Sequence, residues 1–305
     1  MVSGRVIGEG IIKLTYGKIE DEGGKDYIKM STRIAELMAL AGLGYVVDMF
    51  PAVQYLPSWL PGMKFKRDAA LWKKEIDEIE DTMFGLVKEN MLSHDPEVQA
   101  SFIFKNMQEL HTKHEDGKDV QQQRANEEIL AMSGLAIYVG GVETTETTMQ
   151  SFIYAMIQFP SVQKKVQAEI DRVVGSKRFP AFKDQADLPY LHAVMLETLR
   201  WNQALSFDFD PERYVKQPPE LDPREYVFGY GRRICPGKDL ALQNFWILAA
   251  SVLWAFNLVG EGEDPRSLPD ADRFSVGLIS HPIPFKCQFV PRREGLKDKL
   301  AFLTA

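Results

Sequence analysis

One cysteine stands in a short segment whose residue types could do chemistry. The segment FGYGRRICPG, residues 228–237, places Cys235 after two arginines and before a Pro-Gly pair. Pro236 suits the first turn of a helix, because the N–H that proline lacks is not used there. The unpaired N–H groups and the dipole of a helix N-terminus, together with the arginines, favour a thiolate over a thiol. We therefore expect Cys235 to lie at the N-cap of a helix, poised as an anionic ligand or nucleophile.

Four chemistries compete for such a cysteine. A zinc site needs further ligands at fixed spacing, and the sequence holds no C-x-x-C or H-E-x-x-H motif. A dinucleotide loop needs G-x-G-x-x-G, but Ile234 occupies the third glycine position. A catalytic nucleophile needs a base, which the sequence does not identify. A single thiolate ligand of haem iron needs glycines beside a flat macrocycle and a basic residue for its propionates, and this segment has both. A buried structural cysteine beside a turn is the remaining alternative.

The segment resembles the haem-binding signature of the cytochrome P450 superfamily. The matching positions are Phe228, Gly231, Arg233, Cys235 and Gly237, and Ala241 fits the extension of the signature. The resemblance implies that Cys235 is the axial thiolate of haem b and that Phe228 packs near its sulfur. It also implies that Arg233 meets a haem propionate and that Gly237 allows contact with the cofactor.

A second segment, AIYVGGVETTETT at residues 136–148, looks like the oxygen-activation segment of that family. Splitting iron-bound dioxygen requires two protons delivered into an apolar pocket. By the resemblance, Thr144 hydrogen-bonds the bound oxygen or a water, and Glu143 relays protons from outside. Gly140 and Gly141 would let the helix open a groove for oxygen, with Gly141 beside the cofactor. Without the resemblance, the threonines would be weak helix formers clustered on a polar face.

A third motif is expected to support the fold around the cysteine segment rather than to take part in a reaction. Glu197 and Arg200 are three residues apart, so on a helix they share one face and can pair. This spacing is similar to the E-x-x-R motif of the family, and FDPERY at residues 209–214 matches the segment that supplies Arg213. The resemblance implies that these three residues form a buried charge network behind the haem.

Helices must position these motifs, and the sequence predicts helices almost throughout. Apolar spacing and proline or glycine boundaries predict helices over residues 26–47, 68–92, 126–159, 161–174, 187–201 and 238–256, with Asp187 as an N-cap. Weak alternation predicts strands only at residues 274–280 and 285–291. We expect a mainly α fold with minor β: a partial cytochrome P450 fold with a long oxygen-activation helix, an E-x-x-R helix, and the cysteine loop with its following helix.

The resemblance also predicts missing parts. We expect residues 1–305 to form a single, incomplete cytochrome P450 domain without the N-terminal anchor and sheet region of the family. Because Phe209 follows Arg200 so closely, we also expect a deletion near Leu205 and Ser206, where family members have several strands. Lost walls and packing weaken a haem pocket. The alternative to an enzyme is therefore a truncated or decayed family member without haem binding or catalysis.

The composition of the chain disfavours some classes of binding partner. The net charge of −7 disfavours nucleic-acid binding, and two cysteines make no disulfide framework. The apolar run at residues 245–256 is too short to span a bilayer. The resemblance, to fungal microsomal members in particular, implies a monooxygenase that acts on a small apolar substrate in secondary metabolism or xenobiotic oxidation. It implies electrons from NADPH through a reductase. The family is usually held at the endoplasmic reticulum membrane; for this chain, without the anchor, we expect a cytoplasmic or undetermined location.

Overall fold

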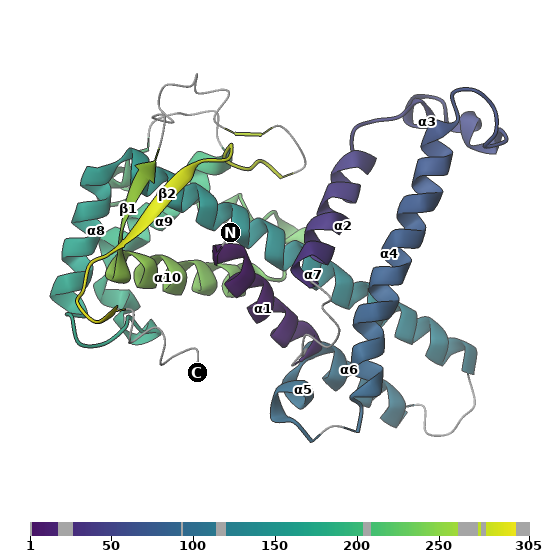
Figure 1. The fold of residues 1–305 in the computed structure, drawn as a ribbon, viewed down its shortest axis with the longest axis horizontal. Coiled ribbons are helices and arrows are strands. Elements are labelled where there is room, and N and C mark those ends of the chain that lie inside the picture. Colours follow the sequence, from purple (N-terminus) through teal and green to yellow (C-terminus); the bar gives the residue numbers. More distant parts are fainter. Residues whose placement is uncertain are drawn as a thin grey trace. The chain divides into compact units, whose positions relative to one another are not determined.

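A computed structural model of the chain describes residues 2–17, 27–92, 94–113, 120–203, 209–261, 274–275 and 279–296. The chain divides into two compact units, Met1–Thr144 and Thr145–Ala305. The division falls inside one long helix, α7 (Val120–Gln158), so no linker separates the units (Figure 1).

The described part of the first unit is helical. Its elements are α1 (Val2–Tyr16), α2 (Tyr27–Ala41), α3 (Val46–Met49), the 3-10 helix η1 (Pro51–Tyr55), α4 (Lys64–Glu89), α5 (Pro96–Ala100), α6 (Phe102–Lys113) and the first part of α7. Its core is made by the buried faces of these helices, including Ile11 of α1, Leu37 of α2, Met83 of α4, Ile103 of α6 and Tyr138 of α7. The Tyr138 hydroxyl also donates a hydrogen bond to the carbonyl of Tyr27, which fixes the start of α2.

The second unit adds a small sheet to a helical core. Its elements are the end of α7, α8 (Pro160–Val173), η2 (Phe182–Asp187), α9 (Pro189–Gln203), η3 (Pro211–Tyr214), η4 (Pro223–Glu225), η5 (Gly231–Arg233), α10 (Lys238–Ala255), β1 (Phe256–Glu261) and β2 (Lys286–Pro291). The fully buried side chains of Phe152, Val194, Trp246 and Trp254 form its core.

The two strands pair antiparallel, from Phe256 opposite Pro291 to Glu261 opposite Lys286. On its other side, β1 is bonded by a helix side chain. Gln163 of α8 accepts from the Leu258 N–H at 2.8 Å and donates to the Leu258 carbonyl at 3.1 Å. A buried glutamine therefore satisfies strand backbone that would otherwise form an unpaired edge.

The expected mainly α fold with minor β is confirmed. The helices predicted over residues 126–159, 161–174 and 238–256 match α7, α8 and α10, and Pro160 lies in the first turn of α8, where it was expected. One strand was missed: β1 directly follows α10, and its backbone bonds go to distant residues that no local pattern reveals.

Three local predictions need correction. The helix expected over residues 26–47 ends at Ala41, because Gly44 at φ +81° turns the chain before the short α3. Asp187 is not the N-cap of α9, since it ends η2 and α9 begins at Pro189. Of the strand expected over 274–280, Phe274 forms an isolated bridge with Pro282, while residues 276–278 lie outside the described part. The deletion expected near Leu205 and Ser206 also falls outside it.

The start of α9 is capped from another helix instead. Glu169 of α8 accepts hydrogen bonds from the N–H groups of Tyr190 and Leu191, both at 2.9 Å. A carboxylate at this end also complements the helix dipole. Within the described ranges, no helix has the length and apolar content needed to cross a membrane.

Candidate functional site

The cysteine loop, defined here as residues 226–237, is closed by one backbone hydrogen bond. The N–H of Cys235 donates to the carbonyl of Phe228 at 2.8 Å. Between them, Gly229 and Gly231 adopt φ values of +75° and +55°, which disfavour residues with a side chain. A Cβ on Gly229 would also lie 3.3 Å from the Arg233 carbonyl oxygen. The loop therefore needs glycine at position 229 to bring Cys235 back against Phe228.

The position of Cys235 relative to α10 differs from the prediction. The first α-helical turn is closed by Ala241, whose N–H donates to the Gly237 carbonyl at 2.8 Å. Gly237 is thus the N-cap, and Cys235 precedes it by two residues. The N–H of Lys238 donates to the Cys235 carbonyl at 3.3 Å rather than pointing at the sulfur. Pro236 therefore lies in the turn before the helix, because the backbone hydrogen bonds of α10 begin only at the Gly237 carbonyl.

The exposed side chains of the loop are of the kinds that suit a flat apolar group that carries carboxylates. Cys235 is exposed, and so are Arg232 and Arg233. Tyr230 is 69% exposed and Ile234 47% exposed, so apolar surface accompanies these cations. An accessible sulfur beside apolar and cationic side chains matches the chemistry of a haem, which offers iron, an apolar disc and two propionates. Among the described residues, no group of three or more His, Cys, Asp or Glu could instead hold a metal ion.

Phe228 lies on the inner side of the loop. It is half-buried, and Lys238 of α10 places its ammonium 5.7 Å from the centre of its ring. The same ammonium donates to the Arg224 carbonyl at 3.1 Å. Lys238 therefore ties the start of α10 to η4, so both ends of the loop are anchored by one side chain.

The structure brings Glu197, Arg200 and Arg213 together. The side chain of Glu197 has no solvent exposure, and Arg200 donates to both its oxygens at 2.7 Å. Arg213 places its Nε 3.5 Å from Oε1, an ion-pair distance without a hydrogen bond. Hydrogen bonding to Glu197 raises the pKa of Arg200. Burial, followed by the Glu197 charge, raises the pKa of the nearby Tyr214. The carboxylate is therefore held by a forked arginine and a second cation.

Sequence reasoning missed one member of this network. The N–H of Asp210 donates to Glu197 Oε1 at 2.6 Å, so backbone as well as side chains binds the carboxylate. The Asp210 side chain also accepts from the Glu212 N–H at 3.1 Å, as the N-cap of η3. The order Asp-Pro at the start of a short helix could have signalled this turn. Its reach to Glu197 could not be read from local spacing.

The segment predicted to activate oxygen, residues 136–148, lies on α7, and its Gly140, Gly141, Glu143 and Thr144 belong to the first unit. Consecutive residues on a helix point in different directions, and accordingly Glu143 is buried while Thr144 is exposed. The Thr144 hydroxyl donates to the Gly140 carbonyl at 2.6 Å. The helix is continuous through this turn, and the groove for oxygen expected at the glycines stays a prediction. Gly140 faces open space, whereas a Cβ on Gly141 would lie 3.2 Å from Ile11 of α1.

Comparison with known proteins assigns the chain to a family. The cytochrome P450 family model matches residues 5–208 and 201–289. A cytochrome P450 monooxygenase of Armillaria gallica is 30% identical over 331 residues, covering 93% of this chain and 63% of the relative. Cytochrome P450 monooxygenase 176 of Postia placenta is 35% identical over 297 residues, covering 82% and 55%. The tryptamine 4-monooxygenase of Psilocybe cyanescens is 34% identical over 299 residues, covering 81% and 57%.

The chain thus spans less than two thirds of the length of these curated relatives. The family match nevertheless includes the long helix, the E-x-x-R helix and the cysteine loop. The chain belongs to the cytochrome P450 family.

Proposed function

We propose that this chain carries the haem-thiolate centre of a monooxygenase, with Cys235 as the axial ligand. The observation that carries the proposal is the closed loop, in which the Cys235 N–H reaches the Phe228 carbonyl at 2.8 Å and leaves the cysteine exposed. A backbone bond holds the residue in place while its side chain stays accessible. An axial ligand needs both properties.

Haem b, when bound, would supply the iron that activates dioxygen, with electrons from NADPH passed on by a reductase. The chain's own residues would bind and orient. Arg233 would pair with a propionate, Gly237 would allow close approach, and Ala241 would present a small side chain at the next turn of α10. The Glu197, Arg200 and Arg213 network would hold the segment that precedes the loop. Relatives named as monooxygenases support this assignment, and the substrate class proposed is a small apolar molecule.

Glu143 and Thr144 are proposed to handle protons on the oxygen side. Thr144 donates its hydroxyl proton to the Gly140 carbonyl, so its oxygen can still accept a hydrogen bond from outside the helix. A rotation of that hydroxyl would redirect the proton outward. Glu143, which is buried on another side of the same helical turn, would relay protons from outside. The helix need not open for this transfer, since the hydroxyl lies on its exposed face.

The test is spectroscopic. Haem is added to the purified chain, which is then reduced under carbon monoxide; we expect the red-shifted Soret band of a thiolate-bound ferrous complex. Cys235→Ala should abolish the band, while Cys287→Ala, which changes the other free cysteine, should retain it. A band that survives Cys235→Ala overturns the ligand assignment. No band in the unaltered protein favours the alternative, a truncated or decayed family member without haem binding.

We also propose that the chain lacks an internal segment of the family at residues 201–208. Two observations support this. The family match is in two pieces that meet there, and the alignment to the Armillaria gallica relative runs over 331 residues although this chain has only 305. Such an alignment requires residues in the relative that have no counterpart here. Sequencing the transcript across the codons of Leu205 and Ser206 tests the proposal: additional in-frame sequence there would overturn it.

A further inference from the structure

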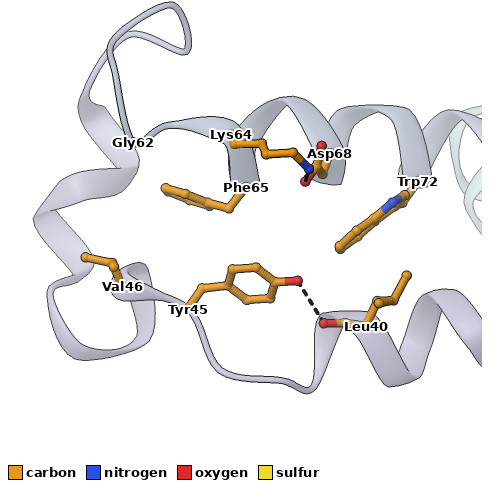
Figure 2. A pocket seen from close by; sticks show the side chains of 8 residues that line it. All are labelled: Leu40, Tyr45, Val46, Gly62, Lys64, Phe65, Asp68 and Trp72. Carbon is orange, nitrogen blue, oxygen red and sulfur yellow. Dashed lines mark hydrogen bonds and ion pairs between the residues drawn. The ribbon is translucent and has the colours of Figure 1, made fainter.

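A pocket of about 610 Å³ lies beside the start of α4 in the first unit. Its walls come from α4, from the end of α2 and from the turn that leads to α3 (Figure 2). The volume falls within the range of roughly 300–1,000 Å³ that is usual for small-molecule sites. Neither the motifs of the haem-thiolate centre nor their supporting residues line this pocket, so it needs its own explanation.

Three aromatic rings surround the pocket. Phe65 and Trp72 are seven residues apart on α4, so they share one face of the helix. Tyr45 lies opposite, with its ring centre 6.3 Å from that of Phe65 and 6.5 Å from that of Trp72. Its hydroxyl donates to the Leu40 carbonyl at 2.9 Å, which fixes the ring against the end of α2 (Figure 2). One hydrogen bond thus holds the Tyr45 ring, and the Tyr45 ring contacts both rings of α4.

A single carboxylate lies between the rings. Asp68 is three residues after Phe65 and four before Trp72, which puts it on the same face of α4, and its side chain is only 24% exposed. Its partner is the ammonium of Lys64, at 2.6 Å. The Lys64 side chain is 78% exposed, so it can swing into solvent at little cost. The Lys64 ammonium group is thus a cation that a ligand could replace at the Asp68 carboxylate.

The other nearby cations are engaged elsewhere. Lys66 donates to the carbonyls of Gln54 and Leu56 at 2.8 and 2.6 Å, and Arg67 donates to the carbonyl of Ser58. These bonds fasten η1 and the loop after it to α4 and direct both charges at carbonyl oxygens. The charged and aromatic side chains that line the pocket are therefore one carboxylate, one loosely held lysine and three rings, and Leu40 and Val46 add aliphatic surface.

We propose that this pocket binds an organic ammonium ion with apolar substituents. The faces of aromatic rings attract such a cation, which costs less to desolvate than a bare ammonium. Asp68 would pair with the bound ammonium ion instead of with Lys64, and the three rings would cover the alkyl groups of the ligand. An anionic ligand fits worse, because it would meet the Asp68 carboxylate in the wall of the pocket.

The experiment is a calorimetric titration of the full chain with benzyltrimethylammonium. We expect the unaltered protein to bind benzyltrimethylammonium. We expect it not to bind the uncharged hydrocarbon in which carbon replaces the nitrogen. Asp68→Asn should weaken binding at least about fivefold, and Trp72→Leu roughly two- to fivefold. Lys64→Gln should strengthen it roughly two- to fivefold, because it removes the competing cation. Two variants with opposite effects cannot both reflect misfolding.

Asp77→Asn is the matched control. Asp77 pairs with Lys73 at 2.7 Å on the same helix, with the same i, i+4 spacing but outside the pocket, so the dissociation constant should not change. The proposal is overturned if the unaltered protein does not bind, if the hydrocarbon binds equally well, or if Asp68→Asn has no more effect than Asp77→Asn. A parallel titration with phosphocholine identifies the source of the group. Tighter binding than benzyltrimethylammonium indicates a lipid headgroup, and weaker binding indicates a free amine.

Discussion

The Glu197 network and the cysteine loop carry two motifs of the same family in opposite physical settings. Glu197 is fully buried, and both its oxygens are bonded to groups of this chain. Cys235 is exposed, and the loop holds it through backbone bonds alone. The partners that hold the Glu197 carboxylate thus belong to this chain, whereas the Cys235 side chain is exposed and accessible to a ligand. Substitutions in the network should therefore change folding, and substitutions of the exposed cysteine should change ligand binding.

The largest effect on folding is expected for Glu197→Gln. This change keeps the shape of the side chain but removes the charge that Arg200 and Arg213 share, and Arg200 is only 12% exposed. Breaking a buried pair leaves an uncompensated charge, so the free energy of unfolding should fall by about 3–5 kcal/mol. Urea denaturation followed by circular dichroism measures this loss.

Glu212→Gln is the control for that experiment. Glu212 pairs with Lys165 in the same unit, and about half of each side chain is exposed. The loss should stay below about 1 kcal/mol, since water solvates both partners once the pair is broken. Equal losses for the two variants would remove the contrast between the buried network and the exposed surface.

The next effect tests the backbone of the loop. Gly229→Ala places a Cβ 3.3 Å from the Arg233 carbonyl, on a residue with φ +75°. Such a residue costs roughly 1–3 kcal/mol, so stability should fall, and haem should bind less tightly because the loop is displaced. Gly140→Ala is the control, and its effect on stability should have the opposite sign. A Cβ at position 140 meets nothing within 4 Å, so alanine should stabilise α7 by up to about 1 kcal/mol. Thermal unfolding of both variants distinguishes loop strain from a general effect of adding a methyl group.

Sequence reasoning succeeded where the physics is local. Pro160 lies in the first turn of α8, and Glu197 and Arg200 pair because three residues bring them to one face of α9. The glycines of the cysteine loop were predicted to lie beside a flat cofactor, and that stays a prediction. What the structure shows is a role within the loop, since the positive φ of Gly229 brings Cys235 back to Phe228.

It failed where the partner is distant in the chain. Asp187 looked like the cap of α9, but Glu169 on another helix performs that role. Strand β1 is stabilised by β2 and by Gln163, neither of which its own residues reveal. In the same way, Tyr45 meets Phe65 and Trp72 only because the chain turns between α2 and α4. These contacts depend on tertiary structure, which periodicity and turn signals do not encode.

A smaller effect is expected between the Glu197 network and the cysteine loop, where His192 of α9 lies near Arg224 of η4 and near Asp222, the N-cap of η4. Burial, together with the Arg224 charge, lowers the pKa of His192 from its ordinary 6.5, although Asp222 opposes this shift. As the pH falls through that value, the unfolded chain takes up a proton before the folded chain does. Stability should therefore be greater above the ordinary pKa and decrease as the pH falls below it. Chemical denaturation from about pH 7.5 to about pH 5.5 measures this loss.

His192→Gln supplies the comparison for the pH experiment. Glutamine does not titrate, so the variant should show a shallower decrease in stability over the same interval. An identical slope in both proteins would mean that the junction between α9 and η4 does not contribute to the pH dependence.

The smallest effect on folding is expected for Cys235→Ala. The side chain is exposed, and the bond that closes the loop uses the main chain, which alanine retains. Without haem, the free energy of unfolding should therefore change by no more than about 0.5 kcal/mol. Cys287→Ala should cost more, about 1 kcal/mol, because that thiol is half-buried in β2. With haem present the order should reverse, since only Cys235→Ala removes the proposed iron ligand and the stabilisation that a bound ligand gives. If Cys235→Ala is the more damaging change without haem, the sulfur packs within the fold, and the contrast between an internally complete network and an outward-facing loop is wrong.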